Sequence, residues 1–128
     1  MPKSVLIVDD SANVRRSIRN FLDAKTDWIV SGEAENGLRA IDIAQEVKPD
    51  LIILDFAMPE MNGIETACVL KHLLPDARIV IFTMFDEILG NTLTSAVGVD
   101  LVFPKPDGLS ALVQAAARLL EGGASGTG

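Results

Sequence analysis

Short apolar runs alternate with segments of helical periodicity five times along the chain. Strands are predicted near 4–8, 28–34, 51–54, 77–83 and 99–103, and helices near 12–23, 37–47, 63–73, 87–96 and 109–121. Runs such as Leu51-Ile52-Ile53-Leu54 are too short for independent helices and are typical of strands buried on both faces. The alternation therefore predicts an α/β domain with a parallel sheet that helices cover on both faces.

The first predicted helix shows how apolar and polar positions are divided. Val14 and Ile18 begin an apolar stripe at helical spacing, which we expect to face the sheet. Arg15, Arg16 and Arg19 lie around the other faces of this helix. Their simplest interpretation is that they are solvated.

Polar side chains stand at the C-terminal ends of four predicted strands. Asp9 and Asp10 follow the first strand, Asp55 the third and Lys105 the fifth, while Thr83 ends the fourth. Taken singly, these are ordinary turn, cap, strand or edge residues. Ligands of parallel sheets bind beyond the carboxyl ends of the strands, so four such signals at one edge favour a single site.

The carboxylates of this predicted site indicate a metal. Carboxylates crowded into one cleft repel each other unless a cation joins them. Oxygen ligands suit Mg²⁺, which in turn recruits a phosphate group. The residues alone therefore favour a site that handles phosphate with a divalent cation.

Composition narrows the class of protein. A length of 128 residues is enough for one domain with a substantial core, and the formal charge of −7 argues against direct binding to a nucleic-acid backbone. The apolar runs are shorter than a membrane span, and no signal segment opens the chain, so we expect a cytoplasmic protein. Cys68 and His72 are single, which disfavours a disulfide or a zinc site, and Cys68 is expected to be a small buried residue.

Four motifs together resemble the receiver domain of two-component response regulators. They are Leu6-Ile7-Val8-Asp9-Asp10, the segment Leu54 to Gly63 with the sequence LDFAMPEMNG, Phe82-Thr83 and Lys105-Pro106. The resemblance covers about residues 3–121 and is greatest to receivers that precede helix-turn-helix output domains. It implies a flavodoxin-like (βα)5 fold of three layers, with a five-stranded parallel sheet of order 2-1-3-4-5. The receiver domain is then expected over 1–121, followed by a flexible Gly/Ser-rich tail or linker over 122–128.

The resemblance also implies a phosphorylation chemistry. Asp55 would be the phospho-acceptor, taking a phosphoryl group from a histidine kinase or a phosphotransfer protein. Asp9, Asp10, Asp55 and the backbone carbonyl of Ala57 would bind Mg²⁺, for which Mn²⁺ could substitute. The protein would be a regulator that assists its own phosphorylation and dephosphorylation rather than an enzyme.

A switch is implied by the same resemblance. Lys105 would contact a phosphoryl oxygen, and Thr83 would move to hydrogen-bond another. The Lys105–Pro106 peptide would be cis, which proline permits. Phosphorylation would change the surface formed by the helix near 87–96, the fifth strand and the fifth helix. That surface would control an output domain or a homodimer.

Several positions depart from the family pattern and concern the readout. The aromatic residue usually found three positions before the lysine is replaced by Val102, and Phe103 is one residue late, so it should point the other way. Met84 replaces a small residue after the threonine, and Phe85 follows it. Met84, Phe85, Val102 and Phe103 are therefore the readout candidates.

Two other functions compete with the switch. A phosphatase of the haloacid dehalogenase class also uses an aspartate nucleophile with Mg²⁺, but it requires a second aspartate where this chain has Ala57. A receiver-like binding module acting without phosphorylation would fit the unusual readout positions. Neither alternative, nor the switch itself, involves a membrane or direct binding to nucleic acid by this chain.

Overall fold

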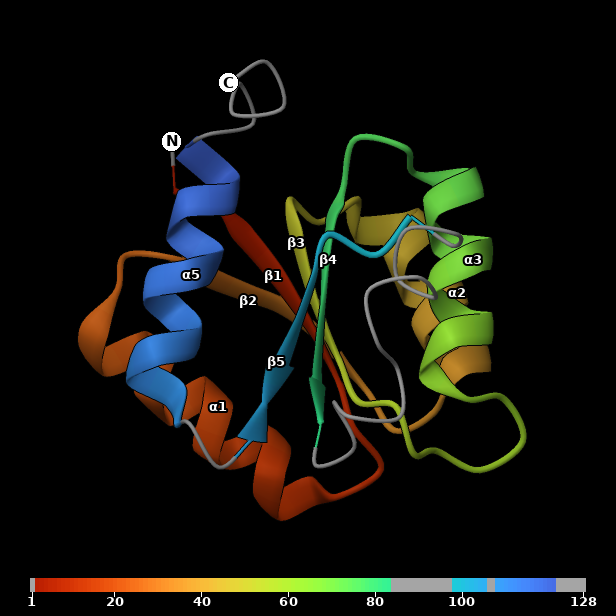
Figure 1. Cartoon of the computed structure of the whole chain (residues 1–128), viewed down its shortest axis with the longest axis horizontal. Coiled ribbons are helices and arrows are strands. Elements are labelled where there is room, and N and C mark those ends of the chain that lie inside the picture. The colour runs from red at the N-terminus through yellow and green to blue at the C-terminus, as the bar shows by residue number, and fades with distance from the viewer. Residues whose placement is uncertain (1, 84–97, 106–107, 122–128) are drawn as a thin grey trace.

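The fold is an α/β sandwich built on a five-stranded parallel sheet (Figure 1). The computed structural model describes residues 2–83, 98–105 and 108–121. The strands are β1 (Ser4–Val8), β2 (Ile29–Ala34), β3 (Leu51–Leu54), β4 (Arg78–Thr83) and β5 (Leu101–Pro104). Their order is β2-β1-β3-β4-β5, and every neighbouring pair is parallel, as the sequence analysis predicted.

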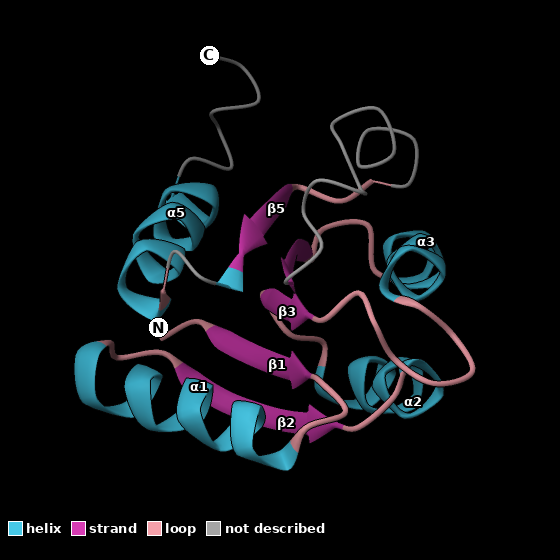
Figure 2. Cartoon of the chain, turned by 60° about the horizontal axis from the view of Figure 1, so that its bottom comes forward, coloured by secondary structure: helices cyan, strands magenta, loops and turns pink. Residues whose placement is uncertain are grey.

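The described helices cover the sheet from both sides. They are α1 (Ala12–Lys25), α2 (Gly37–Val47), α3 (Gly63–Leu73) and α5 (Leu109–Glu121). Helices α1 and α5 lie against one face, and α2 and α3 against the other (Figures 1 and 2). The sheet is therefore the middle layer of three.

Alternating strand residues feed two separate cores. In β3, Leu51 and Ile53 pack with the residues of α1 and α5, whereas Ile52 and Leu54 pack with those of α2 and α3. All four side chains of this strand are buried, because successive residues of a strand point to opposite faces and both faces are covered. Each such side chain contributes about 1.5–3 kcal/mol of burial free energy, which explains the uniformly apolar run.

The predicted elements differ from the observed ones mainly at their ends. Strand β5 begins at Leu101 rather than at residue 99, and the Asp100 carboxylate just before it accepts a hydrogen bond from the Ile79 backbone N–H at 2.8 Å. Helix α1 continues to Lys25, where the Thr26 hydroxyl donates to the Leu22 carbonyl. The predicted helix over 87–96 and the predicted tail over 122–128 lie outside the described residues.

Two further observations bear on the surface. The prediction that Cys68 is buried is wrong, because its side chain is exposed on α3 while the neighbouring Ala67 faces the core. Among the described residues, none of the helices combines the length and the apolar character that crossing a membrane requires.

Candidate functional site

The acidic pair follows directly from the end of β1. The Asp9 N–H donates to the Ala34 carbonyl at 3.1 Å, which continues the pairing of β1 with β2 by one residue. The Asp9 carboxylate then accepts a hydrogen bond from the Ser11 N–H at 2.9 Å, and Ser11 caps α1. Asp9 is 2% exposed, whereas Asp10 is exposed. The turn between strand and helix thus buries the first carboxylate and turns the second outward.

Asp55 stands at the end of the neighbouring strand, β3. Its N–H donates to the Val8 carbonyl at 2.9 Å, so the backbones of the two strands hold the acidic residues side by side. The loop after Asp55 returns to the start of α3, where the Gly63 N–H donates to the Phe56 carbonyl at 2.8 Å. A Cβ atom on Gly63 would lie 2.6 Å from the Asp55 carbonyl oxygen, so only glycine fits this close approach.

The start of α3 fixes the far end of this loop. The Asn62 side chain accepts from the Glu65 N–H, and the Glu65 carboxylate accepts from the Asn62 N–H. This reciprocal pair is a capping box, which satisfies two backbone donors at the helix start. The Asn-Gly dipeptide therefore both begins the helix and allows its first turn to approach the Asp55 backbone closely.

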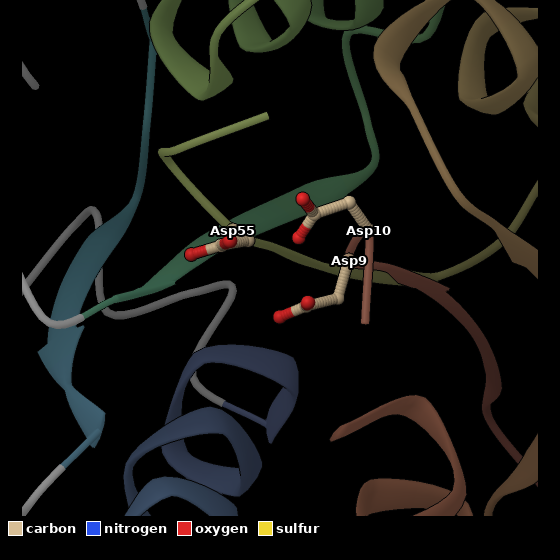
Figure 3. Close-up of side chains that lie close together, drawn as sticks. All are labelled: Asp9, Asp10 and Asp55. Carbon is tan, nitrogen blue, oxygen red and sulfur yellow. The ribbon is translucent and has the colours of Figure 1, made fainter. Parts of the chain in front are cut away.

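Three carboxylates converge at this edge of the sheet. One oxygen from each of Asp9, Asp10 and Asp55 lies within 4.8 Å of the others, and Figure 3 shows the side chains close together. Two oxygens bound to one Mg²⁺ at ~2.1 Å lie at most about 4.2 Å apart, so small side-chain movements would bring all three to one ion. The oxygen donors fit a hard divalent cation. Ala57 is exposed in the following loop, and its carbonyl remains a predicted ligand.

Lys105 brings a positive charge to the same place. Its ammonium lies 3.0 Å from Asp9 Oδ2 and 3.5 Å from Asp55 Oδ1. Thr83 is fully buried at the end of β4, where it is paired in register with Pro104 of β5. The structure thus places at one edge the polar residues predicted at the ends of all four strands, while Pro106 lies outside the described residues.

Burial and charge act together on Asp55. Removal from solvent raises the pKa of its carboxyl, and the nearby Asp9 carboxylate raises it further. Lys105 and the hydrogen bond from the Phe56 N–H lower the pKa but do not cancel the rise. Three carboxylates thus face one lysine at this edge, and a divalent cation would offset the remaining negative charge.

One residue at the site was misinterpreted from the sequence. Arg15 was expected to be solvated, but its side chain is 18% exposed and donates to the Asp9 carbonyl at 2.6 Å. It also pairs with Glu33 of β2 at 3.2 Å. A basic residue one turn into the helix after the acidic pair, together with an acid at the end of the neighbouring strand, was the signal that could have shown this.

The readout positions divide between the two faces of the sheet. Val102 packs with the core under α2 and α3, and Phe103 packs with the core under α1 and α5. In register they face Ile81 and Phe82 of β4. The expectation that Phe103 points away from the usual aromatic position is therefore confirmed. Met84 and Phe85 lie outside the described residues.

Comparison with known proteins agrees with this geometry. Residues 5–117 match the family model of the response regulator receiver domain. The chain belongs to this family. Receiver domains bind Mg²⁺ at an acidic pocket, and this receiver has a cluster of three acidic residues, Asp9, Asp10 and Asp55, at the carboxyl edge of its sheet.

Named relatives include regulators of transcription. The receiver is 39% identical over 117 residues to the uncharacterized transcriptional regulatory protein YxjL of Bacillus subtilis, covering 89% of this chain and 54% of that protein. The nitrate/nitrite response regulator NarL of Escherichia coli is 37% identical over 120 residues, covering 91% of this chain and 56% of that protein. This receiver thus spans about half the length of these curated relatives.

A solved structure supports the fold. A two-component response regulator of the LuxR family from Aurantimonas sp. SI85-9A1 superposes with a TM-score of 0.88 at 27% identity, covering 95% of this chain and 87% of that one. The flavodoxin-like sheet order of this receiver is therefore that of its family.

Proposed function

We propose that this receiver is a phosphorylation-activated switch in which Asp55 accepts the phosphoryl group. The observation that carries this proposal is the convergence of Asp9, Asp10 and Asp55 with the Lys105 ammonium at one sheet edge. The Asp55 carboxylate is only 6% exposed and lies beside one ammonium and two further carboxylates, an arrangement that costs folding free energy. It suits a nucleophile that must meet a charged phosphate.

The chemical step is a transfer from a phosphohistidine. A carboxylate oxygen of Asp55 forms a bond to phosphorus while the bond from phosphorus to the imidazole nitrogen breaks, and that nitrogen keeps the electron pair. Lys105, already 3.5 Å from Asp55, pairs with the incoming phosphoryl oxygens. The switch is reset by hydrolysis, in which water attacks phosphorus and the Asp55 carboxylate leaves, giving inorganic phosphate.

The residues that would hold the metal are Asp9, Asp10, Asp55 and the Ala57 carbonyl. When bound, Mg²⁺ would neutralise charge on the phosphoryl oxygens. The buried Asp9 is held by Ser11 and Lys105, whereas Asp10 faces solvent and is accessible to an ion arriving from outside. Mn²⁺, another oxygen-seeking cation, should bind the same donors.

The readout is expected at β4 and β5. Thr83 lies at the end of β4 beside the site, and a phosphoryl group would give its hydroxyl a strong acceptor. Val102 offers no ring to fill the space behind a moving threonine, so Met84 and Phe85 are the candidates for repacking. The responding surface would be the segment 87–96, β5 and α5, through which an output domain or a homodimer is controlled.

The proposed partner is a histidine kinase or a phosphotransfer protein. A mostly apolar hollow of about 290 Å³ lies between α1 and the start of α5, and Lys105 forms part of its wall. Its lining residues are Asn13, Val14, Ser17, Ile18, Phe82, Lys105 and Leu109. A partner seated there would bring its phosphohistidine beside Asp55. Because relatives such as YxjL are transcriptional regulators, we propose an output in transcription.

Backbone amide chemical shifts with and without beryllofluoride and Mg²⁺ test this switch. Beryllofluoride mimics a phosphoryl group on aspartate, so we expect shifts around Asp10, Asp55 and Lys105 and also along β4, β5 and α5. When beryllofluoride is added to the Asp55→Asn variant already in Mg²⁺, none of these shifts should appear. Shifts confined to the site would contradict the relay to the surface, and no shifts in the wild type would favour a binding module that acts without phosphorylation.

A further inference from the structure

Arg15 is bonded to the peptide group that joins the two acidic residues. Its Nη1 donates to the Asp9 carbonyl oxygen at 2.6 Å, a short contact that is typical of charge-assisted hydrogen bonds. The carbonyl of Asp9 and the N–H of Asp10 belong to the same planar peptide. Fixing the carbonyl direction therefore fixes how the backbone enters Asp10.

Every polar group of Asp9 has a hydrogen-bond partner. Its N–H bonds to Ala34, its carbonyl to Arg15, and its two carboxylate oxygens to Ser11 and Lys105. The Asp10 side chain, in contrast, forms no hydrogen bond or ion pair among the described residues and is exposed. Its placement beside Asp9 and Asp55 depends on the backbone that Arg15 holds.

A second contact fixes the guanidinium itself. Arg15 Nε lies 3.2 Å from Glu33 Oε1, and the other oxygen of Glu33 lies 2.9 Å from Arg19 Nη1. Different nitrogens of Arg15 thus reach a carbonyl and a carboxylate at once, which the planar fork of arginine allows and a single ammonium does not. We call Arg15 and Glu33 the brace.

Stability alone does not explain the brace. The side chains of Arg15, Glu33 and Arg19 are 18%, 29% and 41% exposed, and partly exposed ion pairs contribute little to folding. A positive charge close to the acidic cluster also opposes the binding of another cation. A favourable effect on metal binding must therefore come from geometry.

We propose that Arg15, oriented by Glu33, is a positioning residue that holds the Asp9–Asp10 peptide in the direction that divalent-cation binding requires. This inference rests on the proposed function, in which Asp10 is a metal ligand. Outer partners that orient metal ligands typically change metal affinity by 10–100-fold when they are removed. For a single carbonyl contact we expect the lower end of that range.

An electrostatic role and a positioning role of Arg15 predict opposite changes in Mg²⁺ affinity when the residue is replaced, which makes the test decisive. Arg15→Gln removes a positive charge, so a purely electrostatic role would tighten Mg²⁺ binding. A positioning role weakens it, by roughly tenfold. Arg16→Gln is the matched control, because Arg16 is exposed on the same helix and bonds only to Asn13 among the described residues.

The experiment is calorimetric or NMR titration of the whole chain with Mg²⁺, together with amide spectra of the metal-free proteins. Arg15→Gln should weaken binding and shift the Asp10 amide resonance without metal, whereas Arg16→Gln should do neither. Arg15→Lys keeps the charge, and we expect it to recover only part of the affinity. Glu33→Gln leaves the guanidinium in place but removes its partner, so it should shift the Asp10 amide resonance in the metal-free protein, which covers the case in which Arg15→Gln folds poorly.

The outcomes distinguish the positioning role of Arg15 from the metal site of the proposed switch. If Arg15→Gln binds Mg²⁺ as tightly as Arg16→Gln, or more tightly, the positioning role of Arg15 is overturned and the proposed switch is left intact. An unshifted Asp10 amide in metal-free Arg15→Gln would also overturn it. A wild type that binds no Mg²⁺ would instead refute the metal site of the proposed function.

Discussion

Lys105 lies closer to Asp9 than to the proposed acceptor Asp55. Its ammonium is 3.0 Å from Asp9 Oδ2 and 3.5 Å from Asp55 Oδ1. In this state the lysine balances part of the negative charge that a metal would otherwise neutralise. Cation and lysine thus compete for the same carboxylates, and binding of a phosphoryl group offers the lysine a new partner.

We predict that Lys105→Gln binds Mg²⁺ severalfold more tightly than the wild type, because the competing ammonium is gone. Phosphorylation by a small donor should nevertheless be slower, since the Lys105 ammonium is no longer there to pair with the phosphoryl oxygens. Titration by NMR and a phosphorylation time course measure the two effects. Lys25→Gln removes an equal charge from the far end of α1 and should change neither quantity. Weaker Mg²⁺ binding by Lys105→Gln would contradict this competition.

We predict that Asp55→Asn melts a few degrees higher than the wild type at neutral pH without metal. The pKa of Asp55 is raised in the folded protein, so protonation favours folding, and that contribution is lost as pH rises through the folded pKa. The neutral amide avoids this loss. The difference in melting temperature should therefore shrink with falling pH and vanish below about pH 4.

Thermal unfolding at several pH values measures this difference. Asp23→Asn, a change of equal charge at an exposed position of α1, serves as the control and should leave the melting temperature nearly unchanged. Saturating Mg²⁺ should stabilise the wild type and narrow the gap. A gap that widens toward acid pH would be incompatible with a raised pKa at Asp55.

Much of this site was predictable because parallel strands bring their carboxyl ends to one edge. The short apolar runs before Asp10, Asp55 and Lys105 were enough to predict that these residues meet. The brace was not predictable in the same way. The expected strand order already placed β2 beside β1, but it did not show that the Arg15 side chain turns toward Glu33 and the Asp9 carbonyl instead of toward solvent.

Cys68 shows a different limit of sequence reasoning. Its neighbours Ala67 and Val69 make the local sequence apolar, which suggested burial. Successive residues of a helix are separated by about 100° around the axis, so one position can face the core while the next faces solvent. Here Ala67 and Leu70 are buried, and Cys68 lies on the outer side of α3.

We predict that the phosphoryl group on Asp55 is hydrolysed slowly and that Ala57→Asn speeds this dephosphorylation severalfold. Ala57 is exposed two residues after Asp55 and cannot hydrogen-bond an attacking water, whereas an asparagine amide can. Loss of the phosphoryl group is followed by intact mass after removal of the donor. Ala57→Leu is the apolar control and should not accelerate the loss. Adding Phe85→Glu should increase the rate further, and an unchanged rate in the double variant would refute the explanation.

The measurement of Mg²⁺ binding needs a suitable probe. Trp28 lies just before β2, next to residues that pair with the start of β1, whereas the acidic cluster follows the ends of β1 and β3. We therefore expect Trp28 fluorescence to respond weakly to Mg²⁺. The Phe56→Trp variant in a Trp28→Phe background should respond strongly, because residue 56 is bonded through its N–H to the Asp55 carboxylate. An equal response from both indoles would argue that the cation binds elsewhere.

The most direct test of the switch is the intact mass of the protein after incubation with phosphoramidate and Mg²⁺. We predict that the wild type gains one phosphoryl group, that chelation of the metal strongly slows the reaction, and that Asp55→Asn gains none. Asp50 precedes β3, at the edge of the sheet opposite to Asp55. Asp50→Asn should therefore be phosphorylated like the wild type. An equal yield in Asp55→Asn, or no added mass in the wild type, would contradict the assignment of Asp55 as the phospho-acceptor.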